Sequence, residues 1–175
     1  MNSYDWVAQF QSCYNDAVKA YAAGNRDRSR YFNREQLAFL ESIGCSTQEL
    51  YDFAEDWCGG QEPDFGTALL VTAARRDFFL VVQKGQPSAK RIRLEDLPAK
   101  DAAVAGWAWL PRIIEKARAK LRGEMPDELM YGCGGDRAFL KKVQIHPADF
   151  LRTVWSARDD NQKIIAYVKQ SAAAA

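Results

Sequence analysis

Paired start and stop signals for short helices recur along the chain and limit what it can fold into. Asn33 with Gln36, and Ser46 with Glu49, have the spacing of capping boxes, in which each side chain satisfies a backbone donor of the other residue. Glycines 59 and 60 stand where the second of these helices is expected to end. The pattern predicts a mainly α protein, a compact bundle of short capped helices.

Further helices are expected on the same grounds. Apolar residues between Trp6 and Tyr21 recur at intervals of three and four, with Ser3 as the cap and Gly24 as the stop. In the second half of the chain, Pro111 lies in the first turn of a helix that Gly123 ends. The last three helices are expected to begin at Asp136, at His146–Pro147 and at Asp159 or Asp160.

The segment between Pro63 and Gly85 permits two interpretations. Pro63 and Asp64 are typical of a helix start, and Lys84 and Gly85 of a helix end, which favours one long, largely buried helix. Residues 78–82 are aromatic and β-branched, however, as in a strand. In that second interpretation they pair with residues 90–94 and form one small β-hairpin near residues 78–94.

A polar and basic stretch, residues 83–101, marks a boundary between two parts of opposite charge. Residues 1–85 contain 8 Lys and Arg against 12 Asp and Glu, whereas residues 86–175 contain 16 against 11. We therefore expect an acidic N-terminal helical region, 1–85, and a basic C-terminal helical domain, 86–170. The closing alanines predict a disordered or added tail, 171–175. The asymmetry is typical of two faces of an internal interface, or of a basic half that attracts anions.

Composition excludes several classes of protein. No window holds the roughly 18 apolar residues of a membrane span, and the N-terminus has no secretory signal, so we expect a cytoplasmic protein with free thiols. The four cysteines form no C-x-x-C, and His146 is the single histidine, so we expect neither a metal site nor a cofactor. Nucleic acid is not an expected partner, because the helix over 46–60 presents four carboxylates that would repel phosphates.

Residues 103–170 contain a series of short motifs: a Gly-aromatic step, a Leu-Pro-Arg, a Lys-Ala-Arg-Ala, a Tyr-x-Cys-x-x-Asp turn and a final helix. Their residues are Gly106, Trp107, Leu110, Pro111, Arg112, Lys116, Ala117, Arg118, Ala119, Tyr131, Cys133, Asp136 and the run from Asp159. In these motifs the segment resembles a bacterial family known only as a domain of unknown function. The resemblance implies common ancestry and assigns no activity.

The stretch MYGCGGDRAFL, residues 130–140, is the candidate functional site. Gly134 and Gly135 let backbone N–H groups approach a ligand, and the following helix start favours an anion or a thiolate on Cys133. Three interpretations remain open: a turn and a cap, in which Asp136 caps and Arg112 pairs with it; a pocket for an anion; and a cysteine nucleophile.

The leading hypothesis is a protein that binds a small anionic molecule between the two halves of the chain. Its alternatives are a protein–protein interaction module, including a homodimer, and a cysteine-dependent enzyme with Cys133 as the catalytic residue. A charge within an apolar run needs a partner, so two alternatives stay open for Arg76: an internal salt bridge to the acidic half, for instance to Asp52 or Asp56, or a place in the same cavity as Arg112. The candidate ligand-binding residues are Arg112, Lys116, Tyr131, Cys133, Gly134, Gly135, Asp136, Arg137 and Arg76.

Overall fold

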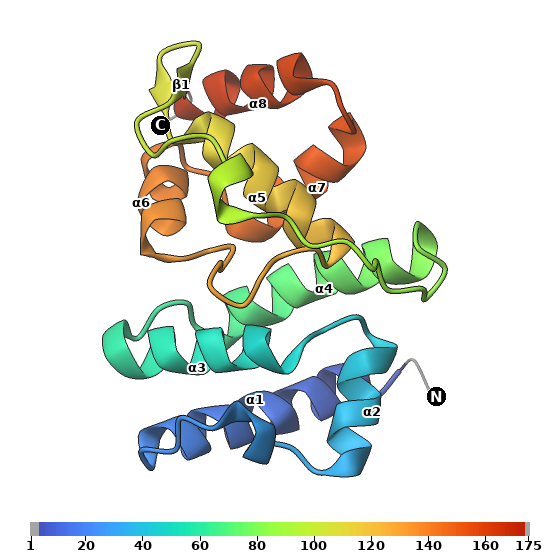
Figure 1. The fold of residues 1–175 in the computed structure, drawn as a ribbon. Coiled ribbons are helices and arrows are strands. Elements are labelled where there is room, and N and C mark those ends of the chain that lie inside the picture. Colours follow the sequence, from blue (N-terminus) through green and yellow to red (C-terminus); the bar gives the residue numbers. More distant parts are fainter. Residues whose placement is uncertain (1–3, 174–175) are drawn as a thin grey trace. The chain divides into compact units, whose positions relative to one another are not determined.

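The computed structural model describes residues 4–173, and these fold into two helical units that divide between Gln86 and Pro87. Helices joined by loops make up both units, with one very short two-stranded sheet in the second unit (Figure 1). The expectation of a mainly α fold of short helices is therefore confirmed. None of the helices within the described range has the length and apolar character that a bilayer span needs.

The first unit consists of four helices and a short 3-10 turn. Its elements are α1 (Trp6–Ala22), η1 (Arg28–Arg30), α2 (Arg34–Ser42), α3 (Thr47–Gly60) and α4 (Phe65–Val81). The helix α1 packs mainly against α3 and also contacts α2 and α4. Phe10, Leu40, Leu50 and Phe53 fill the core between them and are at most 2% exposed.

The capping boxes of α2 and α3 are confirmed. Asn33 accepts from the Gln36 backbone and Ser46 from the Glu49 backbone, and both glutamine and glutamate side chains accept in return. The helix α3 runs through Gly60 and ends in a left-handed Gln61, so glycines 59 and 60 do not stop it. The predicted cap Ser3 lies outside the described residues, and Asp5 occupies the N-cap of α1.

The segment that permitted two interpretations is one helix. Asp64 caps α4 by accepting from the Thr67 backbone, and the helix includes residues 78–81. Residues 90–94 form no strand and lead into η2 (Leu94–Asp96), so the hairpin near residues 78–94 is not formed. Helix propensity summed over the long apolar run outweighs the strand preference of its last five residues.

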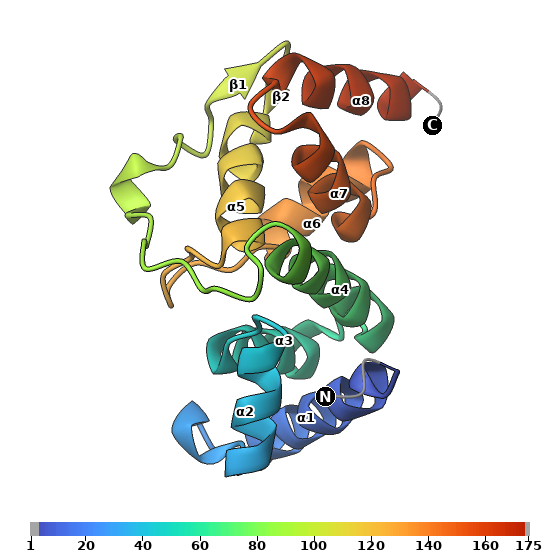
Figure 2. The same cartoon turned by 90° about the vertical axis from the view of Figure 1, so that its right-hand side faces the viewer.

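The second unit contains the sheet and four helices (Figure 2). Its elements after η2 are β1 (Ala103–Val104), β2 (Trp107–Ala108), α5 (Leu110–Arg122), α6 (Gly134–Lys142), α7 (Pro147–Ala157) and α8 (Asn161–Ala173). The strands pair antiparallel around Ala105 and Gly106, both with positive φ, as a two-residue hairpin turn requires. The helix α5 packs against α7, and α7 packs against α8.

Two helix ends of this unit differ in detail from the prediction, whereas the start of the last helix at Asp160 agrees with it. The helix α6 begins at Gly134 with Cys133 as its N-cap, so Asp136 lies inside the first turn and is not the cap. Asp160 accepts from the backbones of Gln162 and Lys163 at the start of α8. The same helix continues to Ala173, so residues 171–173 of the expected tail are helical, while 174 and 175 lie outside the described range.

Candidate functional site

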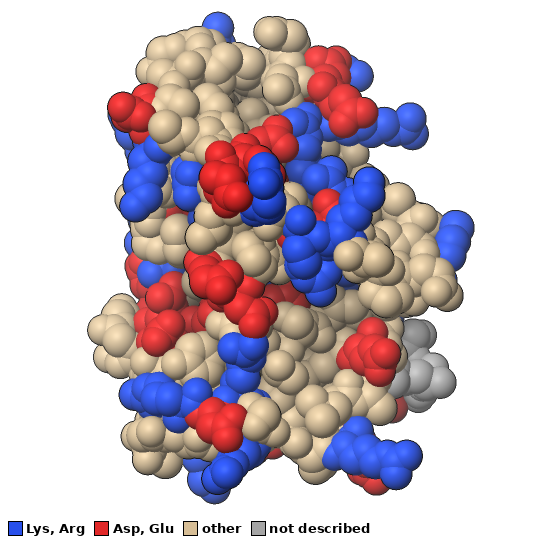
Figure 3. Space-filling view, viewed as in Figure 1, with Lys and Arg blue, Asp and Glu red and all other residues tan. Residues whose placement is uncertain are grey.

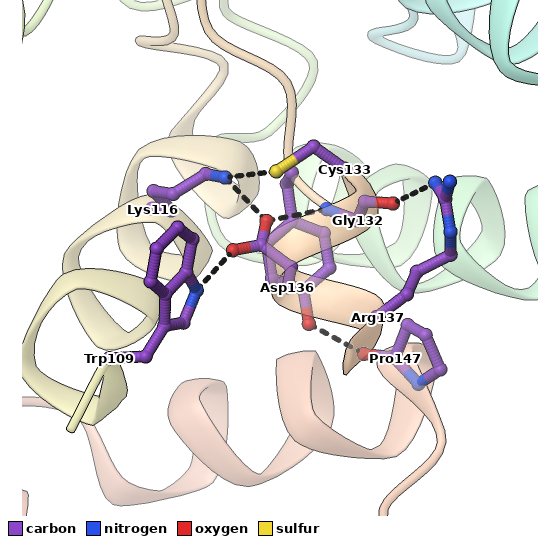
Figure 4. A network of polar contacts seen from close by, with 8 residues as sticks. Trp109, Lys116, Gly132, Cys133, Asp136, Arg137 and Pro147 are labelled. Carbon is purple, nitrogen blue, oxygen red and sulfur yellow. Dashed lines mark hydrogen bonds and ion pairs between the residues drawn. The ribbon is translucent and has the colours of Figure 1, made fainter. Parts of the chain in front are cut away.

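Asp136 is the centre of a buried polar network between α5 and α6 (Figure 4). Its side chain is fully buried and accepts three hydrogen bonds. The Trp109 indole Nε1 donates to one carboxylate oxygen at 2.9 Å, while the Gly132 backbone N–H, at 2.9 Å, and the Lys116 ammonium donate to the other. A carboxylate taken out of water is tolerated only when its lone pairs are satisfied in this way.

Lys116 carries the compensating charge from the middle of α5. Its side chain is 2% exposed, and its Nζ contacts both the Asp136 carboxylate and, at 3.2 Å, the sulfur of Cys133. Arg112, Lys116 and Lys120 follow one another along α5 at intervals of four residues and form a basic stripe on that helix. Lys116 and Lys120, the last two residues of this stripe, point into the protein interior, since both are buried.

The short hairpin brings Trp109 to Asp136. The chain leaves β2 and enters α5 at Trp109, whose φ of 73° is left-handed and rare for a residue with a bulky side chain. Its backbone N–H donates to Ala102 and its carbonyl accepts the first helical bond, from Ile113. Such a conformation persists only where the surroundings fix it. Here the indole bond to Asp136 and the strand pairing do so.

The three glycines of the candidate turn differ in what the structure requires at their positions. Gly132 has a φ of +85°, which lets its N–H point at Asp136 and its carbonyl accept from Arg137 Nη1 at 2.6 Å. Gly135 lies against Trp109, and a Cβ there would fall 2.5 Å from the indole Cζ2. Gly134 is exposed, and a Cβ there would meet only Arg137 Nη2, at 4.0 Å.

Cys133 is partly exposed at the N-cap of α6, and its side chain makes no capping hydrogen bond. Of the other free cysteines, Cys13 and Cys45 are buried, and Cys58 is exposed on α3. Burial, followed by the charge of Asp16, raises the pKa of the Cys13 thiol to about 11. Cys133 thus combines partial exposure with a lysine ammonium against its sulfur.

Tyr131 and Arg112 already have protein partners. The Tyr131 side chain is buried and donates to the Pro147 carbonyl at 2.8 Å, and burial, with a smaller contribution from the Asp136 charge, raises its pKa well above the ordinary value. Arg112 donates to the Pro98 carbonyl at 2.7 Å, and the cation that pairs with Asp136 is Lys116. The expected ion pair between Arg112 and Asp136 is therefore not formed, and that prediction is wrong.

The structure brings most of the predicted site residues together in the second unit, and the two exceptions are Arg112 and Arg76. Arg76 lies on α4 in the first unit, where its guanidinium stands 4.8 Å from the Trp6 ring centroid and 3.4 Å from Asp77. Among residues 4–173, no group of three His, Cys, Asp or Glu side chains is placed to hold a metal ion. The members of the α6 cluster are Lys116, Tyr131, Gly132, Cys133, Gly134, Gly135, Asp136 and Arg137, with Trp109.

The sequence did not predict that Trp109 belongs to this site, because an aromatic residue beside an apolar helix is usually part of the hydrophobic core. Its indole N–H was the available signal, since a buried tryptophan usually finds an acceptor. Gly132 was also missed, although a glycine four residues before a buried aspartate is suited to bring its N–H back to that side chain.

Comparison with known families places this site in a helical domain of uncharacterised type. Residues 96–175 match the family described as Domain of unknown function (DUF5069). This match confirms the resemblance to a domain-of-unknown-function family that the sequence shows in the same part of the chain. No curated protein and no solved structure matches the chain.

Proposed function

We propose that the second unit binds a small anionic molecule at the amino-terminal end of α6. The observation that carries this proposal is the open start of that helix. Cys133 occupies the N-cap position, but its side chain makes no capping hydrogen bond, and Gly134 is exposed. The first-turn N–H groups of a helix have no partner within the helix itself. Such groups, with the helix dipole behind them, favour a carboxylate, sulfate or phosphate group.

Arg137 supplies the positive charge beside this helix start. Its Nη1 donates to the Gly132 carbonyl, which fixes the guanidinium near Gly134. Lys116 contributes less net charge, because Asp136 neutralises it. Tyr131 is buried and Arg112 donates to the Pro98 carbonyl. Cys133 and Arg137 are partly exposed and Gly134 is exposed, so these three are the proposed ligand set. These three residues offer two or three hydrogen-bond donors. That number suits the recognition of one anionic group of a metabolite.

The test is an NMR titration of the full chain with inorganic phosphate and, separately, acetate. We expect saturable shifts of the Gly134 and Gly135 amide resonances. Arg137→Gln should weaken that binding by about tenfold, since a hydrogen bond from a charged donor contributes about 1.5–3 kcal/mol. Arg152→Gln is the matched control, because Arg152 is an exposed arginine that pairs with Asp149 on α7. Shifts that grow linearly with anion concentration, or that are equal in both variants, would reject the proposal.

Self-association is a second candidate, favoured by the exposed end of α4. Leu80, Val81 and Val82 are 39%, 56% and 49% exposed, an uninterrupted apolar run that usually marks a contact surface. Light scattering across a concentration series should then show a dimer in the native chain and a monomer in Val81→Lys. Leu37→Lys, at an isolated exposed leucine, is the control. A monomer at all concentrations removes this candidate.

The compartment that fits both candidates is the cytoplasm. All four cysteines are free thiols, and free thiols persist where the surroundings are reducing.

Lys and Arg side chains gather on the face drawn in Figure 3 over the segment before η2, where Lys90, Arg91 and Arg93 are exposed. These charges would raise the local concentration of small anions without forming a binding site themselves.

A further inference from the structure

The contact between Cys133 and Lys116 joins two groups that can react with each other once sulfur is oxidised. The Lys116 Nζ lies 3.2 Å from the Cys133 sulfur. Lysine side chains are long and usually mobile, but this one is buried along its length and held by Asp136. The amine is therefore kept beside the sulfur and away from water.

Cys133 differs in exposure from two of the other cysteines. It is partly exposed, whereas Cys13 and Cys45 are buried. The thiolate is the form of cysteine that reacts with oxidants, and a helix N-terminus favours negative charge on a sulfur placed there. Cys58 is exposed too, but its sulfur contacts the Val18 carbonyl, at 3.9 Å, rather than an amine.

We propose that Cys133 is a peroxide-sensitive modification site whose sulfenic acid is captured by Lys116 as an internal sulfenamide. The inference goes beyond anion binding and does not depend on it. It rests on the distance between the two groups, the burial of the lysine and the partial exposure of the thiol. The oxidant is hydrogen peroxide.

The reaction balances in two steps. In the first, the Cys133 thiolate attacks one oxygen of hydrogen peroxide, the O–O bond breaks, and the departing hydroxide takes a proton from the Lys116 ammonium. This gives a sulfenic acid, a neutral amine and one water. In the second, the amine nitrogen forms a bond to sulfur, the S–O bond breaks, and hydroxide leaves with a proton from nitrogen as the second water. Sulfur is oxidised by two electrons, and the peroxide oxygen is reduced.

The product has a distinct mass and a distinct chemistry. A sulfenamide between Cys133 and Lys116 lacks two hydrogen atoms relative to the reduced chain, whereas a sulfenic, sulfinic or sulfonic acid adds oxygen. The cross-link also prevents trypsin from cutting after Lys116 and joins that peptide to the one that contains Cys133. A thiol reductant restores the starting mass, because a thiolate can attack the sulfur of the S–N bond.

The experiment treats the reduced full-length protein with a small excess of hydrogen peroxide, without added anions, and follows it by intact and peptide mass spectrometry. We expect a reversible loss of two hydrogen atoms that maps to Cys133 and Lys116. The same loss should occur in Cys58→Ser and should be absent in Cys133→Ser.

A variant without the amine isolates the role of Lys116. Lys116→Met alone would leave Asp136 buried without its cation, so the double variant K116M/D136N is the one to use. It should accumulate a sulfenic acid at Cys133 that a cyclic 1,3-dione traps. If the native chain gives that trapped sulfenic acid and no cross-link, or if Cys133 stays unmodified while Cys58 is oxidised, the proposal is overturned. Neither result bears on the titration with phosphate.

Discussion

The indole of Trp109 lies directly against the backbone of Gly135, so that a Cβ at position 135 would fall 2.5 Å from Cζ2 of the ring. At the same time the indole N–H donates to Asp136, the next residue along the chain. The Trp109 side chain therefore constrains two successive residues of α6. It contacts Gly135 sterically and donates a hydrogen bond to Asp136.

Gly135→Ala should destabilise the protein by about 1–3 kcal/mol, the usual cost of forcing an extra methyl group into a packed site. The rigid ring cannot give way as the end of a flexible side chain would. Gly134→Ala is the matched control, one residue earlier in the same turn. The added methyl there would meet only the flexible end of Arg137, at 4.0 Å, so that change should be neutral or stabilising by up to about 1 kcal/mol, because alanine is the better helix former. Chemical denaturation measures both, and equal effects would contradict the assigned packing.

Trp109→Phe keeps an aromatic ring but removes the donor to Asp136. We expect a loss of about 1.5–3 kcal/mol, since the acceptor is a buried carboxylate. Trp107→Phe is a suitable control, because the Trp107 ring is half-buried and contacts the Lys142 ammonium through its face at 5.6 Å, an interaction a phenyl ring can keep. Similar losses of stability in the two variants would argue against the importance of the Trp109–Asp136 bond.

Lys116 and Asp136 should behave as a coupled pair in a double-mutant cycle. Lys116→Met and Asp136→Asn each remove one charge and leave the other buried, which costs about 3–5 kcal/mol. In K116M/D136N no uncompensated charge remains, so the double variant should lose at least about 1 kcal/mol less than the two single losses added together. Additive losses in urea denaturation would show that the two side chains do not interact energetically.

Tyr14→Phe should stabilise the first unit by up to about 1 kcal/mol at neutral pH. The Tyr14 hydroxyl is buried and has no hydrogen-bond partner within residues 4–173, so its removal relieves a desolvated group. Tyr4→Phe, at a side chain that is 89% exposed, is the control and should change nothing. A clear loss of stability in Tyr14→Phe would mean that the hydroxyl has a partner after all.

The same residue predicts how stability depends on alkaline pH. Burial, and secondarily the charge of Asp64, raises the pKa of Tyr14 from 10.0 to about 12. As pH rises from about 10 to about 12, the unfolded chain loses the phenolic proton before the folded chain does, so the free energy of unfolding falls. Below pH 10 both states keep the proton and the contribution is constant. The alkaline decline measured by denaturation should be smaller in Tyr14→Phe than in the native chain.

The sequence predicts the parts of this fold that depend on neighbours along the chain. The capping boxes at Asn33 and Ser46 and the Asp64 cap use contacts three residues apart, and the structure contains each of them. Helix ends were less predictable: α3 continues through its glycines and stops at a left-handed Gln61. The two-residue strands were not foreseen, because a pair so short has almost no periodicity.

The candidate site was found in the right stretch, but the roles within it depend on tertiary contacts. Asp136 has the spacing of a cap from the sequence, yet donors from α5 and from Gly132 draw it into the interior. Lys116 has the position of a solvated basic residue, and only the carboxylate opposite makes its burial tolerable. Whether Cys133, Gly134 and Arg137 bind an anion stays a prediction.

The buried ion pair also has a consequence for how the second unit opens. If α6 and the turn before it detached alone, Lys116 would be left charged inside the remaining structure with no carboxylate beside it. Partial opening of that kind is therefore suppressed, and α5 and α6 should separate from each other only when both become hydrated. Amide protons of the two helices, together with the Gly132 N–H that lies in neither, should then exchange with solvent as one cooperative unit.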